Sequence, residues 1–388
     1  MKLSFVRYFF SYLIHAKTRQ RLLFIAIFGL ILSSFALIVL QSTMGGLQSK
    51  LIARSKRVTG HGVVEFSQAS EKEVRVAIEE LKESGLYAVG ELELELLIKY
   101  GQYYAPILIH GINPTGDLPR FIEGRVFDEL ILPRSLSLKV NAAIGDLVRL
   151  LSPAHLDSFM GDIPRMSSLY VDYLVSTDVQ EVDEFHGWAN LLRIQSLIKK
   201  RTLNRIRLFD PYDKTQVELI LRRNGLADAS VLSWEEKNST LVWALGLETT
   251  VMVFLFAAMT LLVSLAIISG LLIFFTKVKG DMASFWILGT EEREIFKSSR
   301  IFLFSLSFFS VTLGLFLGLG FLYGLDYFGP NIMPDVFVDR KIPVAISTRG
   351  VLLSFSIPFF ISLFFANLSL KAFRKDVDYL SYIRTLGR

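Results

Sequence analysis

A long apolar stretch near the start of the chain sets the fold class: residues 22–40 are LLFIAIFGLILSSFALIVL. A helix that crosses a membrane needs about 20 apolar residues, because each residue advances about 1.5 Å through roughly 30 Å of hydrocarbon. Three further stretches meet this requirement, at about 251–275, 301–325 and 351–370. The first stretch is too long for the apolar part of a signal peptide, and no small-residue cleavage site follows it. We therefore expect four transmembrane helices, the first of them uncleaved.

The composition agrees with a membrane protein. Of the 388 residues, 52% are hydrophobic and 20% are charged, and many of the 32 phenylalanines lie in the apolar stretches. This composition excludes a disordered chain and a simple cytosolic enzyme. The net charge of +5 comes from basic residues beside the apolar stretches, which indicates membrane orientation and not nucleic-acid binding. Because cysteine is absent, the chain has no disulfides and no zinc site of the cysteine type.

Basic residues in the short flanking segments predict the orientation, because lysine and arginine are retained on the cytoplasmic side. Segments 1–21, 277–300 and 371–388 each contain five of them, whereas segment 326–349 contains three, balanced by three aspartates. Both termini and the 277–300 loop are therefore expected in the cytoplasm. The region between the first two helices then faces outward.

The predicted fold class is an α-helical membrane domain of four transmembrane helices with an α+β extracytoplasmic domain inserted between helices 1 and 2. The parts are a cytoplasmic amphipathic elbow helix (1–21), transmembrane helices (22–44, 249–276, 301–325 and 350–370), a periplasmic α+β domain (45–248), a cytoplasmic loop (277–300), a periplasmic loop (326–349) and a cytoplasmic tail (371–388).

Alternating and helical patterns predict the elements of the outer domain. A helix is expected from Ser70, which forms a capping box with Glu73, to Gly85. In residues 91–97, ELELELL, the alternation predicts a strand whose Glu91 and Glu93 lie on a solvated face. Further strands are expected at 60–66, 105–111, 147–151 and 169–176, and further helices at about 189–200 and 212–224.

The sequence contains no catalytic constellation. Its five histidines never occur in the spacing H-x-x-x-H, and neither a G-x-S-x-G elbow nor a Walker A loop is found. We therefore expect a non-catalytic chain that holds no metal and no cofactor of its own.

One outer segment, SPAHLDSFMGDIPRMS at 152–167, carries several apolar residues on a loop that contains proline and glycine. Apolar residues at an exposed loop tip are typical of partner contacts. The alternative is that the loop folds these residues onto its own domain.

The cytoplasmic loop has the pattern of a short amphipathic helix. Gly280 and Asp281 predict a turn and an N-cap, and Met282, Phe285 and Trp286 then fall on one helical face. Gly289 is expected to end this helix. Such a helix suits docking into a groove of a cytoplasmic partner, and the alternative is that it lies on lipid.

Small residues in the third apolar stretch predict close helix packing, because two G-x-x-x-G steps follow each other, Gly314 with Gly318 and Gly320 with Gly324. No apolar stretch contains a central charged residue. Since ion and proton pathways normally need such charges, the sequence argues against an ion-coupled transporter or channel. Movement is expected to be driven from outside the membrane.

Four stretches resemble a known family of membrane proteins. They are TMGGLQSKL (43–51), ILPRSLSLKVNAAIGDLVRLLSP (131–153), SFMGDIPRM (158–166) and IISGLLIFFTKVKGDMASFWILGT (267–290). With the order of one span, a large outer domain and three spans, the chain resembles the macrolide-exporter and cell-division-type ABC permeases. Among them it is similar to the lipoprotein-releasing permeases of the LolC/LolE type. Two departures are Ser284, Phe285 and Trp286, where the family usually has I-L-[KR], and Pro133, where relatives often have glycine.

The resemblance implies a multi-pass protein of the bacterial inner membrane that pairs with a second permease copy or paralogue. A cytoplasmic ABC ATPase dimer, which binds ATP and Mg²⁺, would dock on the coupling helix of the 277–300 loop and drive the outer domains by mechanotransmission. The other implied partners are lipoprotein substrates, a periplasmic lipoprotein chaperone and membrane lipid, with no nucleic acid. The alternatives are a macrolide- or toxin-exporter-like permease, and a cell-division-type signalling permease that activates a peptidoglycan hydrolase without transport.

The resemblance also assigns residues to these roles. The chaperone-binding hook is expected to use Phe159, Met160, Gly161, Ile163 and Pro164. ATPase coupling is expected to use Gly280, Asp281, Met282, Phe285, Trp286 and Gly289. A lipoprotein cavity between the first two spans is expected to be lined by Phe35, Leu40, Met44, Val251, Met252, Phe254 and Met259. Each buried CH₂ of an acyl chain contributes about 0.8 kcal/mol, so apolar walls alone can hold lipid.

Overall fold

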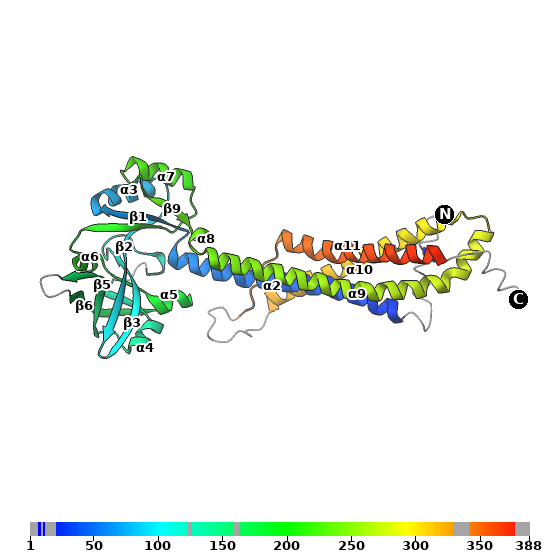
Figure 1. Ribbon diagram of the computed structural model, residues 1–388, viewed down its shortest axis with the longest axis horizontal. Helices are drawn as coiled ribbons and strands as arrows, with labels where there is room; N and C mark the ends of the chain where they lie inside the picture. The colour runs from blue at the N-terminus through cyan, green and yellow to red at the C-terminus, as the bar shows by residue number, and fades with distance from the viewer. Residues whose placement is uncertain are drawn as a thin grey trace. The chain divides into compact units, whose positions relative to one another are not determined.

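The structure is a computed structural model that describes residues 7–8, 11, 21–122, 126–157, 163–328 and 341–376. It contains two compact units (Figure 1). The sheet unit is Lys50–Trp243, and the helical unit comprises the residues up to Ser49 together with those from Ala244 onward. Each unit is described by itself.

A mixed sheet forms the framework of the sheet unit. Its strands are β1 (Gly62–Ser70), β2 (Ala88–Tyr100), β3 (Tyr103–Ile112), β4 (Leu130–Pro133), β5 (Leu147–Asp157), β6 (Ile163–Val175), β7 (His186–Asn190), β8 (Thr202–Leu208) and β9 (Ser230–Ser233). They are hydrogen-bonded in the order β3-β7-β4-β6-β5-β2-β8-β1-β9, and β2 also pairs with β3. The six strands from β3 to β2 therefore form a closed circuit. The pairs β3–β7 and β4–β6 are parallel.

Short helices cover this sheet. They are α3 (Glu71–Glu83), α4 (Arg134–Val140), α5 (Gln180–Phe185), α6 (Leu191–Ile198), α7 (Lys214–Arg223) and α8 (Trp234–Lys237), with a 3₁₀ turn at Arg120–Ile122. The backbone N–H of Ser70 donates to Glu73 Oε2 (3.3 Å) at the start of α3, as the capping pattern predicted. Gly85 follows the helix with a φ of +86°, a conformation that glycine adopts without strain. In Figure 1, α3 and α7 lie beside each other near β1 and β9.

Two apolar clusters stabilise the sheet unit from opposite faces of β2. Leu92 and Leu96 belong to the larger cluster, which includes Leu81 of α3, whereas Val89 belongs to a smaller cluster around Trp188. Because successive residues of a strand point to opposite faces, even-numbered and odd-numbered residues of β2 meet different surroundings. Burying one such aliphatic side chain contributes about 1.5–3 kcal/mol. The odd-numbered face also holds the charged residues described below.

In the described part of the helical unit, four helices are long and apolar enough to cross a membrane. They are α2 (Arg21–Thr59), α9 (Ser239–Ile287), α10 (Glu292–Phe328) and α11 (Thr348–Asp376). Each includes one of the four predicted apolar stretches. The described helices are longer than the predicted spans, because apolar content defines only the part of a helix that matches the hydrocarbon thickness.

Helix α2 contacts the other three helices. Ser33 Oγ lies 2.7 Å from Thr260 Oγ1 of α9. Ser34 Oγ donates to the carbonyl oxygen of Ser354 in α11 (3.0 Å). A Cβ atom on Gly314 of α10 would lie 2.3 Å from the carbonyl oxygen of Ile31. Through these contacts α2 packs against each of the other three long helices.

The two G-x-x-x-G steps of α10 differ. Gly314 and Gly318 lie against α2 at distances that only glycine allows, since a Cβ on Gly318 would lie 2.3 Å from Ile38 Cγ2. Gly320 and Gly324 have no atom within 4 Å of the position of a Cβ. Close packing within the chain therefore uses the first step only.

The predicted turn at Gly280 and Asp281 is wrong, because both residues lie inside α9, which continues to Ile287. Met282 and Ala283 are buried in the apolar cluster of the helical unit, and this packing holds the helix together across the glycine. The end at Gly289 is confirmed, since its φ is +93° and α10 begins at Glu292.

Candidate functional site

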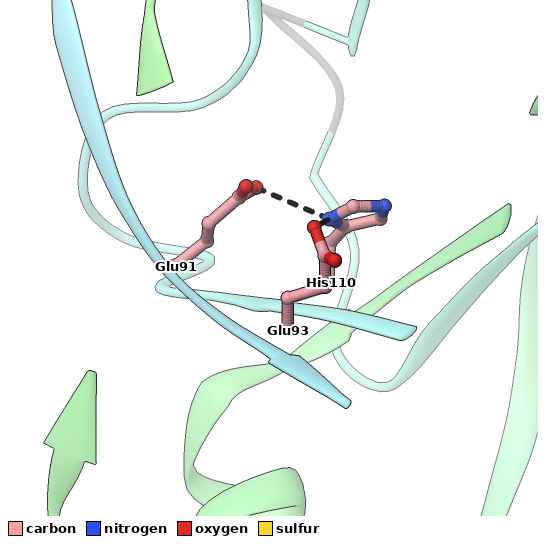
Figure 2. Close-up of side chains that lie close together, drawn as sticks. All are labelled: Glu91, Glu93 and His110. Carbon is pink, nitrogen blue, oxygen red and sulfur yellow. Dashed lines mark ion pairs between the residues drawn. The ribbon is translucent and has the colours of Figure 1, made fainter. Parts of the chain in front are cut away.

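A cluster of charged side chains lies on the odd-numbered face of β2 (Figure 2). Strand register brings its members together: Glu93 of β2 is paired with His110 of β3, and Glu91 is paired with Arg205 of β8. Arg207 lies two residues beyond Arg205, on the same face of the sheet. We call these five residues the charged cluster.

In each carboxylate of the charged cluster, one oxygen contacts an arginine guanidinium. Arg207 donates through Nε to Glu91 Oε1 (3.0 Å) and also contacts this oxygen through Nη2. Arg205 Nη2 lies 3.0 Å from Glu93 Oε1. The second oxygens face His110, whose Nδ1 lies 3.3 Å from Glu91 Oε2 and 3.6 Å from Glu93 Oε2.

Burial distinguishes this cluster from a surface ion-pair network. Glu91 is 1% exposed and His110 is 2% exposed. Burial alone would raise the pKa of Glu91, but the Arg207 guanidinium and His110 hold that pKa below its usual range. Glu91 is therefore an anion at neutral pH, even though its surroundings exclude solvent.

A second histidine, His186, adjoins the charged cluster. His110 Nε2 lies 2.9 Å from His186 Nδ1, and the two rings are stacked with their centroids 5.1 Å apart. His110 is also stacked on Trp188 (5.8 Å between centroids). Burial lowers the pKa of His186 to about 3, so this ring is neutral at neutral pH.

The cluster borders a cavity of about 340 Å³, whose lining includes Glu93, His186, Arg205 and Arg207. Arg207 Nη1 donates to the carbonyl oxygen of Thr59 (2.6 Å), the last residue of α2. Since the last carbonyls of a helix lack partners within the helix, Arg207 both caps α2 and neutralises Glu91.

Two further contacts hold the end of α2 in the sheet unit. Trp234 Nε1 donates to Ser55 Oγ (3.0 Å), and Lys56 Nζ donates to Glu235 Oε1 (2.6 Å). Ser55 and Trp234 line the same cavity, and Lys56 and Glu235 lie next to them in the chain. Hydrogen bonds therefore link the polar groups around the cavity to the end of α2.

The prediction of a solvated face for Glu91 and Glu93 is wrong. The alternation of β2 is real, but both faces are covered at Glu91 and Glu93, and only Glu95 of the three glutamates is exposed. Alternation along one strand distinguishes its two faces, but it does not indicate which other elements of the fold cover each face. Sequence reasoning also missed Arg205, Arg207 and His186, although the spacing of the two arginines in TLNRIRL gave a signal of a shared strand face.

The described residues of the predicted hook, Ile163 and Pro164, lie at the end of the β5–β6 hairpin. Phe159, Met160 and Gly161 lie outside the described residues. Ile163 and Pro164 begin β6 and are exposed, and Met166 two residues on is also exposed. Their pairing with Asp157 and Leu156 of β5 continues the hairpin to its described end. The described part of the segment therefore does not fold its apolar side chains into the core.

The predicted coupling residues lie at the end of α9, and their apolar face points inward. Met282 is 0% exposed, and Phe285 and Trp286 pack partly buried against the same cluster. Tyr8 from the N-terminal segment donates its hydroxyl to Asp281 Oδ2 (2.5 Å), and its ring lies 5.6 Å from that of Phe285. The exposed apolar side chains here are Ile287 (63%) and Leu288 (80%), just before Gly289. The structure thus differs from the sequence interpretation, in which Met282, Phe285 and Trp286 face a partner.

The predicted lipoprotein-cavity residues lie on α2 and α9. Phe35 faces α10, since its ring lies 5.7 Å from that of Phe321. Leu40, Val251 and Phe254 are exposed within the chain. Met44, Met252 and Met259 are partly exposed. Exposed apolar side chains on long apolar helices suit contact with lipid or another chain, and their role in holding a lipoprotein stays a prediction.

Comparison with known proteins points to one group of membrane proteins. No protein-family model matches the chain. The lipoprotein-releasing system transmembrane protein LolC of Neisseria meningitidis serogroup B is 24% identical over 296 residues, which cover 70% of each chain. The chain resembles a lipoprotein-releasing permease. The resemblance to LolC that the sequence stretches predicted is thereby confirmed.

Among solved structures, the sheet-rich part has a weak likeness to the extracellular domain of the noncanonic ABC-type transporter YknZ from Gram-positive bacteria. The TM-score is 0.29 and the identity 10%, over 44% of this chain and 98% of that chain. At this score the likeness carries no argument, so the similarity to LolC rests on sequence.

Proposed function

We propose that the chain is the permease subunit of an ABC transporter in the bacterial inner membrane. It extracts lipoproteins from the membrane and passes them to a periplasmic chaperone, while a separate ATPase subunit hydrolyses ATP. The observation that carries this proposal is the similarity to LolC over 70% of both chains. Four apolar helices of membrane-spanning length support it independently.

The β5–β6 hairpin supports the step in which the cargo is handed over. Its described end presents Ile163, Pro164 and Met166 to solvent, and the first two of these belong to the predicted hook. A chaperone that receives acylated proteins needs a docking contact outside the membrane. Apolar side chains at a hairpin end supply such a contact with little loss of conformational entropy, because the strands already fix the backbone.

The end of α9 supports the coupling step, with a revised assignment of its residues. We place the ATPase contact on Ser284, Ile287 and Leu288, which are exposed. Phe285 and Trp286 instead brace this surface from within, together with Tyr8. A rigid, apolar helix end suits a groove on a cytoplasmic partner.

The experiment that tests the function is lipoprotein release from proteoliposomes that contain the chain, its ATPase and its second permease. Pro164→Asp introduces a charge at the exposed hairpin end, and Ser168→Asp is the matched control on the same strand, also at an exposed position. We expect Pro164→Asp to lower release to the chaperone at least tenfold, with ATPase co-purification unchanged, and Ser168→Asp to leave release at the wild-type rate.

Wild-type proteoliposomes that hydrolyse ATP but release no lipoprotein contradict the proposed function. Assays of macrolide efflux and of peptidoglycan-hydrolase activation then decide between the two alternatives. Release that is equal for both variants contradicts the assignment of the hairpin alone.

A further inference from the structure

The charged cluster contains three electronegative atoms that face each other. They are Glu91 Oε2, Glu93 Oε2 and His110 Nδ1, and all lie within 4.8 Å of one another (Figure 2). Two of the three, Glu91 Oε2 and His110 Nδ1, are fully buried and make no hydrogen bond. A buried polar atom without a partner is destabilising by about 1–3 kcal/mol, so this arrangement needs a positively charged occupant.

A proton fits this position poorly. A charge-assisted N–H···O bond is about 2.7–2.9 Å long, whereas His110 Nδ1 lies 3.3 Å from Glu91 Oε2 and 3.6 Å from Glu93 Oε2. The two arginines do not fill it either, because their short contacts are with the other oxygen, Oε1, of each glutamate, and Arg207 Nη2 comes no nearer than 3.5 Å to Glu93 Oε2.

A metal ion fits it better. A tetrahedral ion with bonds of about 2.1 Å places its ligand atoms about 3.4 Å apart, close to the two measured separations. One imidazole and two carboxylates are a ligand set for Zn²⁺ and related first-row divalent ions, whereas Ca²⁺ and Mg²⁺ prefer oxygen alone. We propose that Glu91, Glu93 and His110 form a Zn²⁺ site in the sheet unit.

The surroundings of the three ligands support this assignment. A histidine ligand normally donates its other N–H to a neighbour that fixes the ring, and His110 Nε2 lies 2.9 Å from His186 Nδ1. Arg205 and Arg207 hold the two carboxylates in place through Oε1. Their positive charges also weaken the affinity for a cation, so we expect binding in the micromolar range and not the tight binding of a structural zinc site.

The cavity offers an entry path from the side of Glu93. The cavity of about 340 Å³ reaches Glu93, whose side chain is 9% exposed. Three protein ligands with one position open to a cavity is the arrangement of a zinc site that exchanges water or another ligand. Arg207 contacts both Glu91 and the carbonyl oxygen of Thr59. A metal ion bound to Glu91 is therefore expected to affect the contact between Arg207 and the end of α2.

The test is Zn²⁺ titration of the full-length chain, without a histidine tag, purified in detergent and stripped with a chelator. Binding is measured by isothermal titration calorimetry and by competition with a chromophoric chelator. We expect one Zn²⁺ per chain, with affinity lowered at least tenfold in Glu93→Gln and in His110→Gln. Glu95→Gln is the matched control, because it removes an exposed carboxylate from the same face of the same strand.

Folding of each variant is checked by circular dichroism and thermal unfolding in chelator. Should His110→Gln fail to fold, Glu93→Gln alone decides, because its side chain borders the cavity. The proposal is overturned if the wild-type chain binds no Zn²⁺. It is equally overturned if Glu93→Gln binds as well as Glu95→Gln, since a proton then occupies the position and any zinc lies elsewhere.

Discussion

Replacing Glu91 by glutamine is expected to destabilise the sheet unit more than any exposed charge change can. The substitution keeps the shape of the side chain but leaves the Arg207 guanidinium without its closest counter-ion in a buried setting. Breaking a buried ion pair on one side costs about 3–5 kcal/mol. Arg207 retains the carbonyl of Thr59 and lies 3.5 Å from Glu93 Oε2, so the lower end, about 3 kcal/mol, is expected.

For a unit of this size, about 3 kcal/mol corresponds to a fall in Tm of roughly 6–12 °C. The assay is thermal unfolding of the full-length chain in detergent with chelator, followed by tryptophan fluorescence, because Trp188 and Trp234 are buried in the sheet unit. Glu95→Gln is the control and is expected to stay within about 0.5 kcal/mol of wild type. The double variant Glu91→Gln/Arg207→Gln removes both charges. Its loss of unfolding free energy should be smaller than the sum of the losses in the two single variants. A Tm for Glu91→Gln within 2 °C of wild type refutes the reasoning.

Three further predictions concern packing and pH. Gly314→Val is expected to destabilise the helical unit by about 1–3 kcal/mol, because its Cβ would lie 2.3 Å from a backbone oxygen. Gly320→Val is the control, since a Cβ there meets no atom within 4 Å. The monodisperse yield of the two variants in size-exclusion chromatography checks this prediction, and equal yields contradict it. Leu81→Ala should lower the free energy of unfolding in urea by about 2–5 kcal/mol, because the side chain is fully buried. Val76→Ala, on the exposed face of the same helix, should lower it by less than about 0.5 kcal/mol. Burial lowers the pKa of His186 from 6.5 to about 3, so the unfolded chain binds more protons below pH 6.5, and the Tm should fall between pH 7 and pH 5. His186→Gln should weaken this fall, and an unchanged pH profile of the variant contradicts the assignment.

Local patterns predicted those parts of the structure that depend on neighbouring residues in the chain. The apolar stretches found all four long helices, because hydrocarbon thickness imposes a length that sequence can report. The capping pattern at Ser70 and the glycine at Gly85 placed α3 correctly. The strand at 91–97 was also found, although its bounds in the structure are wider.

Residues that meet only through strand register were not predictable from one sequence. Glu91 and Arg205 are paired although more than a hundred residues separate them in the chain. The covering of the second face of β2 by the cluster around Trp188 is equally non-local, so the burial of Glu91 could not be foreseen. At the end of α9, the amphipathic face was identified correctly, but its orientation depended on the helices that pack against it.

The closed circuit of β3, β7, β4, β6, β5 and β2 has a consequence for how other proteins can recognise the sheet unit. Most strands that the structure describes have hydrogen-bonded neighbours on both sides, and β9 is the terminal strand of the order. A peptide that binds by strand addition needs a row of unsatisfied backbone amides. Among the described strands, β9 (Ser230–Ser233) ends the order and is paired on one side only. Over most of this unit a binding partner must therefore be recognised by the shape and chemistry of side chains. Single substitutions can change such recognition during evolution without altering the strand pairing.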